Sequence, residues 1–118
     1  MTAVDLSPGR LDLQNVTQGD SFSESVTFSQ SGAALNLSTY THRAQVRSER
    51  SSDAALLATM TVGTGSASTG VLSFSLTAAQ TADLDPGRYW WEYEWTVGST
   101  VRTMLSGEFV VAPQVAHA

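Results

Sequence analysis

The sequence contains no cysteine and no lysine, and only 14% of its residues are charged. The absence of cysteine excludes a disulfide framework, a thiol nucleophile and a zinc site with cysteine ligands, so packing must stabilise the fold. The six basic residues are all arginines against 11 acidic residues, and the net charge of −5 argues against a nucleic-acid partner. No apolar run approaches the length of a membrane span, so we expect no membrane partner either.

The length of 118 residues suits one domain, and a hydrophobic fraction of 42% is enough for a core. Residues 1–13 contain no apolar run behind a basic segment, so we expect no secretory signal and synthesis in a cytosol. We predict a folded domain over residues 11–112, with an N-terminal arm over residues 1–10 and a C-terminal tail over residues 113–118.

Apolar and polar residues alternate along most of the chain, which is the pattern of strands that bury one face. Residues 40–48 place Ala44 and Val46 on one side and Arg43 and Arg47 on the other. The sequence GTGSASTG over residues 63–70 predicts a mobile loop between two strands. The strongest strand follows Asp85-Pro86-Gly87 and places its aromatic and apolar residues on one face: Tyr89, Trp91, Tyr93, Trp95 and Val97.

Thr77, with Gln80 three residues later, predicts a capping box and one short helical turn. About seven strands separated by turn signals predict an all-β fold, an immunoglobulin-like antiparallel β-sandwich. If the last two strands pair with Val97 opposite Val101, then Trp91 lies opposite Gly107, and the large indole covers a strand glycine. This register also places Trp95 opposite Thr103, Tyr93 opposite Leu105, Trp90 opposite Glu108 and Tyr89 opposite Phe109.

The sequence offers few groups for catalysis. His42 is the one histidine placed in a strand, and no nucleophile motif or paired carboxylate accompanies it, so we expect a partly buried structural histidine rather than a base. The carboxylates are scattered and show no metal-ligand spacing. We therefore expect no enzyme activity, no catalytic residue, no cofactor and no metal.

One face of the strongest strand carries candidate contact residues, because Arg88, Trp90, Glu92 and Glu94 alternate with the core residues. An exposed Trp90 would be able to stack on a sugar or anchor a partner protein. The alternative is an indole packed at the edge of the sandwich or under residues 63–70. A solvated sheet face is the simplest interpretation of the two glutamates.

Six segments together resemble an immunoglobulin-like β-sandwich module of tailed-bacteriophage virion proteins, which occurs in head decorations, tails and baseplates. The resemblance covers about residues 11–112 and marks turns and core positions rather than a site. This sequence departs from the family at Ala33-Ala34, where a proline is common, and in its Trp90-Trp91 pair. The segments are Gly19-Asp20-Ser21-Phe22, Leu35-Asn36-Leu37-Ser38, Arg43-Ala44-Gln45-Val46-Arg47, Leu76-Thr77, Leu84-Asp85-Pro86-Gly87-Arg88-Tyr89 and Leu105-Ser106-Gly107-Glu108-Phe109-Val110-Val111.

The resemblance implies an accessory structural protein of a bacteriophage particle. Such a protein is made in the host bacterial cytoplasm, attached to the outer surface of the capsid or tail, and has other virion structural proteins as partners. Its sheet edges and its two terminal segments are the expected contacts, and a homo-oligomer is open. The alternative function is a carbohydrate-binding adhesin module that holds host-surface glycans through Trp90 and the neighbouring carboxylates.

Overall fold

The computed structural model describes residues 9–30, 32–51 and 53–114, and almost all of its regular structure is β-strand. The prediction of an all-β chain with one short helical turn is therefore confirmed. The elements in chain order are β1 (Gly9–Arg10), β2 (Leu13–Thr17), β3 (Phe22–Thr27), β4 (Ser29–Gln30), β5 (Ala33–Ala34), β6 (Thr41–Arg47), β7 (Leu56–Ser66), a 3₁₀ turn (Ala67–Thr69), β8 (Val71–Leu76), α1 (Ala78–Ala82), β9 (Gly87–Val97) and β10 (Thr100–Ala112).

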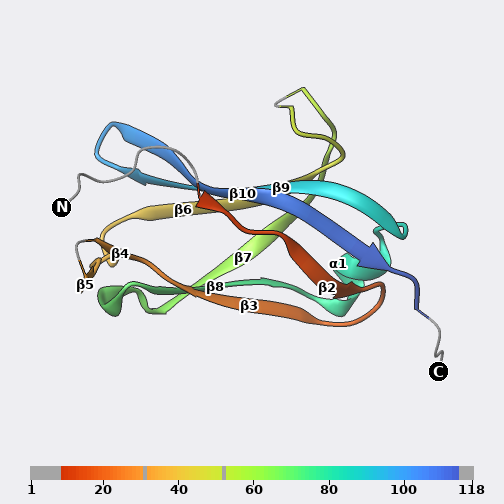
Figure 1. Ribbon diagram of the computed structural model, residues 1–118, viewed down its shortest axis with the longest axis horizontal. Helices are drawn as coiled ribbons and strands as arrows, with labels where there is room; N and C mark the ends of the chain where they lie inside the picture. Colours follow the sequence, from red (N-terminus) through yellow and green to blue (C-terminus); the bar gives the residue numbers. More distant parts are fainter. Residues whose placement is uncertain (1–8, 31, 52, 115–118) are drawn as a thin grey trace.

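The main sheet is single, mixed and strongly curled, like half of a barrel (Figure 1), rather than the clear two-sheet sandwich that we predicted. Its strand order is β1-β10-β9-β6-β7-β8-β3, and β2 also pairs with β10. Pairs within it are antiparallel except that β1 and β2 run parallel to β10. A separate two-stranded sheet joins β4 to β5.

The long strand β7 is the physical reason for the single sheet. Its first half pairs with β6, where Met60 lies opposite Ala44, and its second half pairs with β8, where Val62 lies opposite Phe74. The hydrogen bonding therefore continues from one layer into the other. The predicted loop over residues 63–70 is wrong in its first half, because Gly63 is paired with Ser73 inside this strand.

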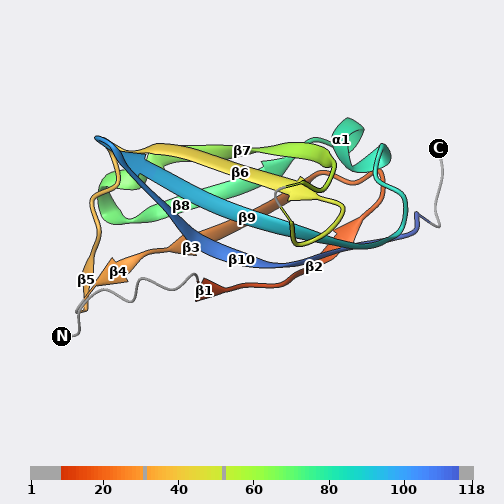
Figure 2. The same cartoon turned by 90° about the horizontal axis from the view of Figure 1, so that it is seen from above.

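The core fills the concave side of the curled sheet, between β9 and β10 on one side and β3 and β8 on the other (Figures 1 and 2). The rings of Phe22 in β3 and Phe109 in β10 meet edge to face at 5.8 Å, and those of Phe74 in β8 and Trp91 in β9 at 5.5 Å. Such contacts between aromatic rings add to the free energy gained from burying apolar area.

The predicted inner face of β9 is confirmed for its central residues. Trp91 and Tyr93 are fully buried and Trp95 is nearly so, whereas Tyr89 is half-buried and Val97, next to the hairpin turn, is exposed. The alternation of side chains along a strand thus identified the core correctly in the middle of the strand but not at its turn end.

The predicted register of β9 with β10 is correct over one half of the pair and wrong over the other. Gly107 lies opposite Trp91 and Leu105 opposite Tyr93, as expected. Near the hairpin, Val97 instead pairs with Thr100 and Trp95 with Arg102, because the turn is one residue shorter than assumed. An irregularity between Thr103 and Leu105 restores the expected register, as the extra residue of a β-bulge does.

Gly107 has a second neighbour that the sequence did not reveal. A Cβ atom at this position would collide with the backbone carbonyl of Leu11 and lie 2.8 Å from Oδ1 of Asp12. The Trp91 indole donates a hydrogen bond of 2.7 Å to the same Leu11 carbonyl, and the Glu108 amide donates one of 2.9 Å to Asp12 Oδ1. The segment between β1 and β2 is thereby held closely against β10.

The predicted capping box is confirmed, because the Gln80 amide donates to the Thr77 hydroxyl and the Gln80 side chain accepts from the Thr77 amide. Thr81 of this short helix is fully buried, and its hydroxyl donates a hydrogen bond of 2.8 Å to the Asp20 carbonyl and accepts one of 3.0 Å from the Gly19 amide. The helix therefore fastens the turn between β2 and β3.

The N-terminal arm that we predicted over residues 1–10 overlaps the sheet, because Gly9 and Arg10 form β1 opposite Leu105 and Ser106. Residues 1–8 of the arm and residues 115–118 of the tail lie outside the described residues. Pro113 and Gln114 follow β10 without strand structure. Within the described residues, no helix is long and apolar enough to span a membrane.

Candidate binding site

The outer face of β6 and β9 brings together polar side chains that are far apart in the sequence. The antiparallel register places Arg43 opposite Glu94, Gln45 opposite Glu92 and Arg47 opposite Trp90. Residues directly opposite each other in a sheet share a face, and their side chains lie within reach of each other. The strand alternation that buries Ala44, Val46 and the β9 aromatics therefore also creates a charged outer surface.

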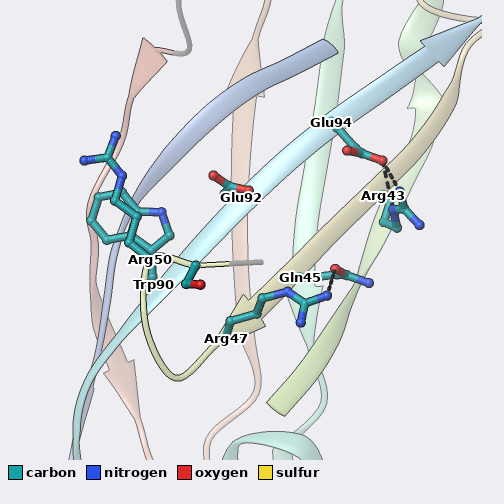
Figure 3. Close-up of a pocket in the computed structure, with 8 residues that line it drawn as sticks. Arg43, Gln45, Arg47, Arg50, Trp90, Glu92 and Glu94 are labelled. Atoms are coloured by element: carbon teal, nitrogen blue, oxygen red, sulfur yellow. Dashed lines mark hydrogen bonds and ion pairs between the residues drawn. The ribbon is translucent and has the colours of Figure 1, made fainter. Parts of the chain in front are cut away.

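A concavity of about 500 Å³ lies on this surface, in the size range of small-ligand sites. Two adjacent strands supply most of its wall, and the segment between β6 and β7 supplies the rest (Figure 3). It is lined by Arg43, Gln45, Arg47, Arg50, Ser51, Trp90, Glu92 and Glu94.

Trp90 is half-buried, and arginines provide much of its cover. The guanidinium carbon of Arg10, from β1, lies 5.0 Å from the ring centroid, and that of Arg50, from the segment after β6, lies 4.9 Å from it. Both distances are typical of cation–π contacts. The indole N–H is buried and has no hydrogen-bond partner among the described residues. Trp90 is therefore neither a fully exposed stacking surface nor a core residue.

Three of the arginines near this face are neutralised by carboxylates. Arg43 pairs with Glu94, while Arg10 pairs with Asp12 at 2.7 Å and Arg88 with Glu108 at 3.7 Å. The hydrogen bond from Arg10, helped by the Glu108 amide, lowers the pKa of Asp12. The arginine of each pair is largely exposed, so the pairs contribute little to stability, but they compensate the positive charge of these three arginines.

Arg47 and Arg50 have no carboxylate within ion-pair distance among the described residues. Arg47 donates to the Ala54 carbonyl at 2.9 Å and to Oε1 of Gln45 at 3.0 Å, so two of its N–H groups are used by neutral acceptors. The Arg50 side chain forms no hydrogen bond within the described part of the chain. Glu92, which is exposed, likewise has no cation within ion-pair distance there.

The structure brings three of the four sequence-predicted contact residues together in the concavity, namely Trp90, Glu92 and Glu94. Arg88 does not line it and instead reaches Glu108. Nothing in the sequence indicated that the other lining residues belong to a site. The sequence placed Arg43 and Arg47 on the outward side of a strand, but it did not reveal that this strand pairs with β9. The missed lining residues are Arg43, Gln45, Arg47, Arg50 and Ser51.

His42 lines a second hollow of about 560 Å³, beside Thr41, Thr59 and Met60. Its Nδ1 lies 2.6 Å from the Tyr93 hydroxyl oxygen, and its Nε2 is buried without a partner among the described residues. Burial lowers the pKa of His42, and the nearby Leu37 backbone acts in the opposite direction. Burial also raises the pKa of Tyr93, so the two rings form a neutral pair at pH 7. No nucleophile and base come together here in the manner of a catalytic triad.

Within the described residues, no group of three or more histidine and carboxylate side chains comes close enough to hold a metal ion. Comparison with known proteins adds no further constraint on this geometry. No protein-family model matches the chain, and no curated protein is significantly similar to it.

Proposed function

We propose that this chain is an accessory structural protein of a bacteriophage particle, bound to the outer surface of the capsid or tail through protein–protein contacts. We further propose that its fold is a variant of the immunoglobulin-like sandwich, in which β7 hydrogen-bonds to both layers and so joins them into one curled sheet. The six segments that resemble the phage module support both proposals, although fold alone does not determine function.

The structural observation that carries the proposal is the location of the uncompensated polar groups. Arg47 and Glu92 lie on the outer face of β6 and β9, and Arg50 lies beside them on the segment after β6, at a concavity open to a partner. The inner face is filled by packed aromatic residues. Polar groups on a rigid outer face suit docking to another protein. The edge strand β3 adds a second surface, because within the described residues it pairs on one side only, with β8.

Particle incorporation tests this function. Particles purified from a phage that carries the gene should contain the chain in a fixed ratio to the major capsid or tail protein, measured by mass spectrometry. Particles from a phage that lacks the gene should rebind the purified chain saturably, with an unrelated acidic β-protein of similar size as the control. Absence of the chain from purified particles, together with no rebinding, would show that the proposal is wrong.

A carbohydrate-binding adhesin is the second candidate, favoured by the volume of the concavity and by the presence of Trp90 in its wall. The guanidinium groups of Arg10 and Arg50 over the indole argue against it, because a sugar would have to displace one of them to stack on the ring. A glycan array with the wild-type chain and Trp90→Ala separates the candidates. Glycan binding that disappears in Trp90→Ala would favour the adhesin.

A further inference from the structure

Arg50 lies in the segment between β6 and β7. The described residues of this segment, 48–51 and 53–55, project from the convex side of the sheet in Figure 1 and reach across β9 in Figure 2. A cation–π contact of 4.9 Å with the centroid of the Trp90 ring holds this exposed guanidinium beside the indole. Without the indole, a long arginine side chain on a loop would sample many rotamers, at an entropic cost for any ligand that must order it. Trp90 thus preorganises Arg50.

A cation–π contact does not use the N–H groups of a guanidinium as donors to an oxygen acceptor, so the donors of Arg50 stay available to a ligand. An arginine has five N–H donors in the plane of the group, arranged to bind a carboxylate with two parallel hydrogen bonds. Arg50 has no acceptor for these donors among the described residues, and Arg47, in the same concavity, carries a second charge without a carboxylate. The geometry is that of an anion site held in place before its ligand arrives.

We propose that this concavity binds one carboxylate of an otherwise polar peptide segment of a partner protein. Arg50 is the anion-binding residue and Trp90 a positioning residue that acts through Arg50. Arg47, which reaches toward Gln45 on the other side of the concavity (Figure 3), adds positive charge to the site but does not share the carboxylate with Arg50. The inference deepens the proposed function, on which it rests, by naming the chemistry of the partner. It concerns a short segment and not a surface of the whole partner, because the hollow holds about 500 Å³.

Glu92 and Glu94 determine which anions fit. They lie in the same wall as the arginines, so a ligand with several adjacent negative charges, such as a nucleic-acid backbone, would be repelled. A single carboxylate meets less of that repulsion, because Arg43 neutralises Glu94 and only Glu92 is left without a cation among the described residues. Glu92, which lacks a cation, and Gln45 and Ser51 offer acceptors and donors to the amide and carbonyl groups that flank a carboxylate in a peptide. The covered indole favours a peptide over a sugar ring.

The experiment is a titration of the ¹⁵N-labelled full chain, followed by ¹H–¹⁵N correlation spectra. The probes are a capped pentapeptide with one aspartate between serine and glycine residues, its asparagine analogue, and sialyllactose, which carries one carboxylate on a sugar. The indole N–H of Trp90, assigned by its loss in Trp90→Phe, reports on the site. We expect saturable shifts with the aspartate peptide at a Kd of about 1 mM, as suits a single short segment.

Two variants with the same change in net charge locate the site. Arg50→Gln should weaken binding of the aspartate peptide about tenfold, the value of one charge-assisted interaction. Arg102→Gln removes an arginine of β10 that does not line the concavity, and it should change the Kd less than about twofold. Both side chains are at least partly exposed, so neither substitution should disturb the dispersion of the spectrum.

The positioning role of Trp90 is tested by measuring whether the effect of Arg50→Gln on peptide binding depends on the presence of the indole. Trp90→Leu should weaken peptide binding about threefold, and in that background Arg50→Gln should have less effect than it has in the wild type. Additive effects of the two substitutions would remove the positioning role.

Other outcomes would overturn the inference. Equal binding of the asparagine peptide would show that the site does not recognise a carboxylate. Tighter binding of sialyllactose would show that the ligand is a glycan and not a peptide. Equal losses in Arg50→Gln and Arg102→Gln would show that binding depends on net charge alone. Absence of any shift with the aspartate peptide would also overturn it. Particle incorporation is measured independently, so a chain that enters particles but binds no peptide would lose this inference and keep the proposed function.

Discussion

Trp90 and Trp91 are adjacent in β9 and have the same side chain, yet they lie in opposite environments. Trp91 is fully buried on the inner face, packs edge to face on Phe74 and donates its indole N–H to the Leu11 carbonyl. Trp90 is half-buried on the outer face, under two guanidinium groups, and its indole N–H has no partner among the described residues. The direction of a side chain from a strand sets this difference.

The comparison separates two uses of a large aromatic residue. On the inner face, the indole contributes buried apolar area and satisfies a backbone carbonyl, so its contribution is to the free energy of folding. On the outer face, the indole contacts two guanidinium groups at the surface, and we expect its contribution to folding to be small. Substitutions at the two positions should therefore differ in which measurement they change.

The largest effect is expected for Trp91→Ala. Removing a fully buried indole leaves a cavity and an unpaired Leu11 carbonyl, so the free energy of unfolding should fall by about 3–5 kcal/mol, measured by urea unfolding. Trp91→Phe is the companion variant in case the alanine variant does not fold. It retains much of the apolar packing but loses the hydrogen bond, and it should be intermediate. An effect of Trp91→Ala below about 1 kcal/mol would break the comparison.

Gly107→Ala tests the register and the close approach of Leu11 together. The added Cβ would meet backbone atoms of Leu11, which cannot rotate away, so we expect a loss of about 1–3 kcal/mol in unfolding free energy. Gly65→Ala in β7 is the matched control, because a Cβ there meets nothing within 4 Å and it should change stability by less than about 0.5 kcal/mol. Equal effects of the two substitutions would contradict the packing of the β1–β2 segment on β10.

The sequence alone could predict the inner face of β9 and its pairing with Leu105 and Gly107, because period-two alternation is a local property of a strand. It could not predict the β-bulge between Thr103 and Leu105, where an extra residue changes the alternation. Nor could it predict the single sheet, because the pairing of β7 with both β6 and β8 depends on how the whole chain curls.

The candidate site was predictable only along one strand. Trp90, Glu92 and Glu94 alternate on β9, so their shared face followed from the sequence. Arg47 joins them through the β6–β9 pairing, and Arg10 and Arg50 reach the indole from 80 and 40 positions earlier in the chain. Contacts of that kind depend on tertiary structure and carry no periodic signal.

His42 tests the properties of the inner face at its margin, where the imidazole is half-buried against Tyr93. Its folded pKa is below the ordinary value of 6.5, so the folded state binds fewer protons than the unfolded state in that window. Stability should therefore fall as the pH drops below about 6.5 towards the folded pKa. In His42→Gln this part of the pH dependence should disappear, as measured by urea unfolding between pH 8 and pH 5.

An unchanged pH dependence in His42→Gln would mean that the imidazole does not contribute through its burial. The carboxylates are a separate source of acid sensitivity, since Arg10 and the Glu108 amide hold the pKa of Asp12 below its ordinary value of 3.8. The stability that Asp12 contributes is lost only as the pH falls below that value. Measurements above pH 5 therefore isolate the histidine.

The smallest changes in folding are expected on the outer face, for Trp90→Ala and then Arg50→Gln. The indole is only half-buried and its contacts with Arg10 and Arg50 are made at the surface, so the unfolding free energy should fall by about 1 kcal/mol. Arg50→Gln is the paired variant, and it should cost less than about 0.5 kcal/mol, because this exposed arginine forms no ion pair among the described residues. Urea unfolding of both variants beside Trp91→Ala provides the test. A loss in Trp90→Ala as large as that in Trp91→Ala would mean that the outer indole is a second core residue, and the division of β9 into a folding face and a binding face would be wrong.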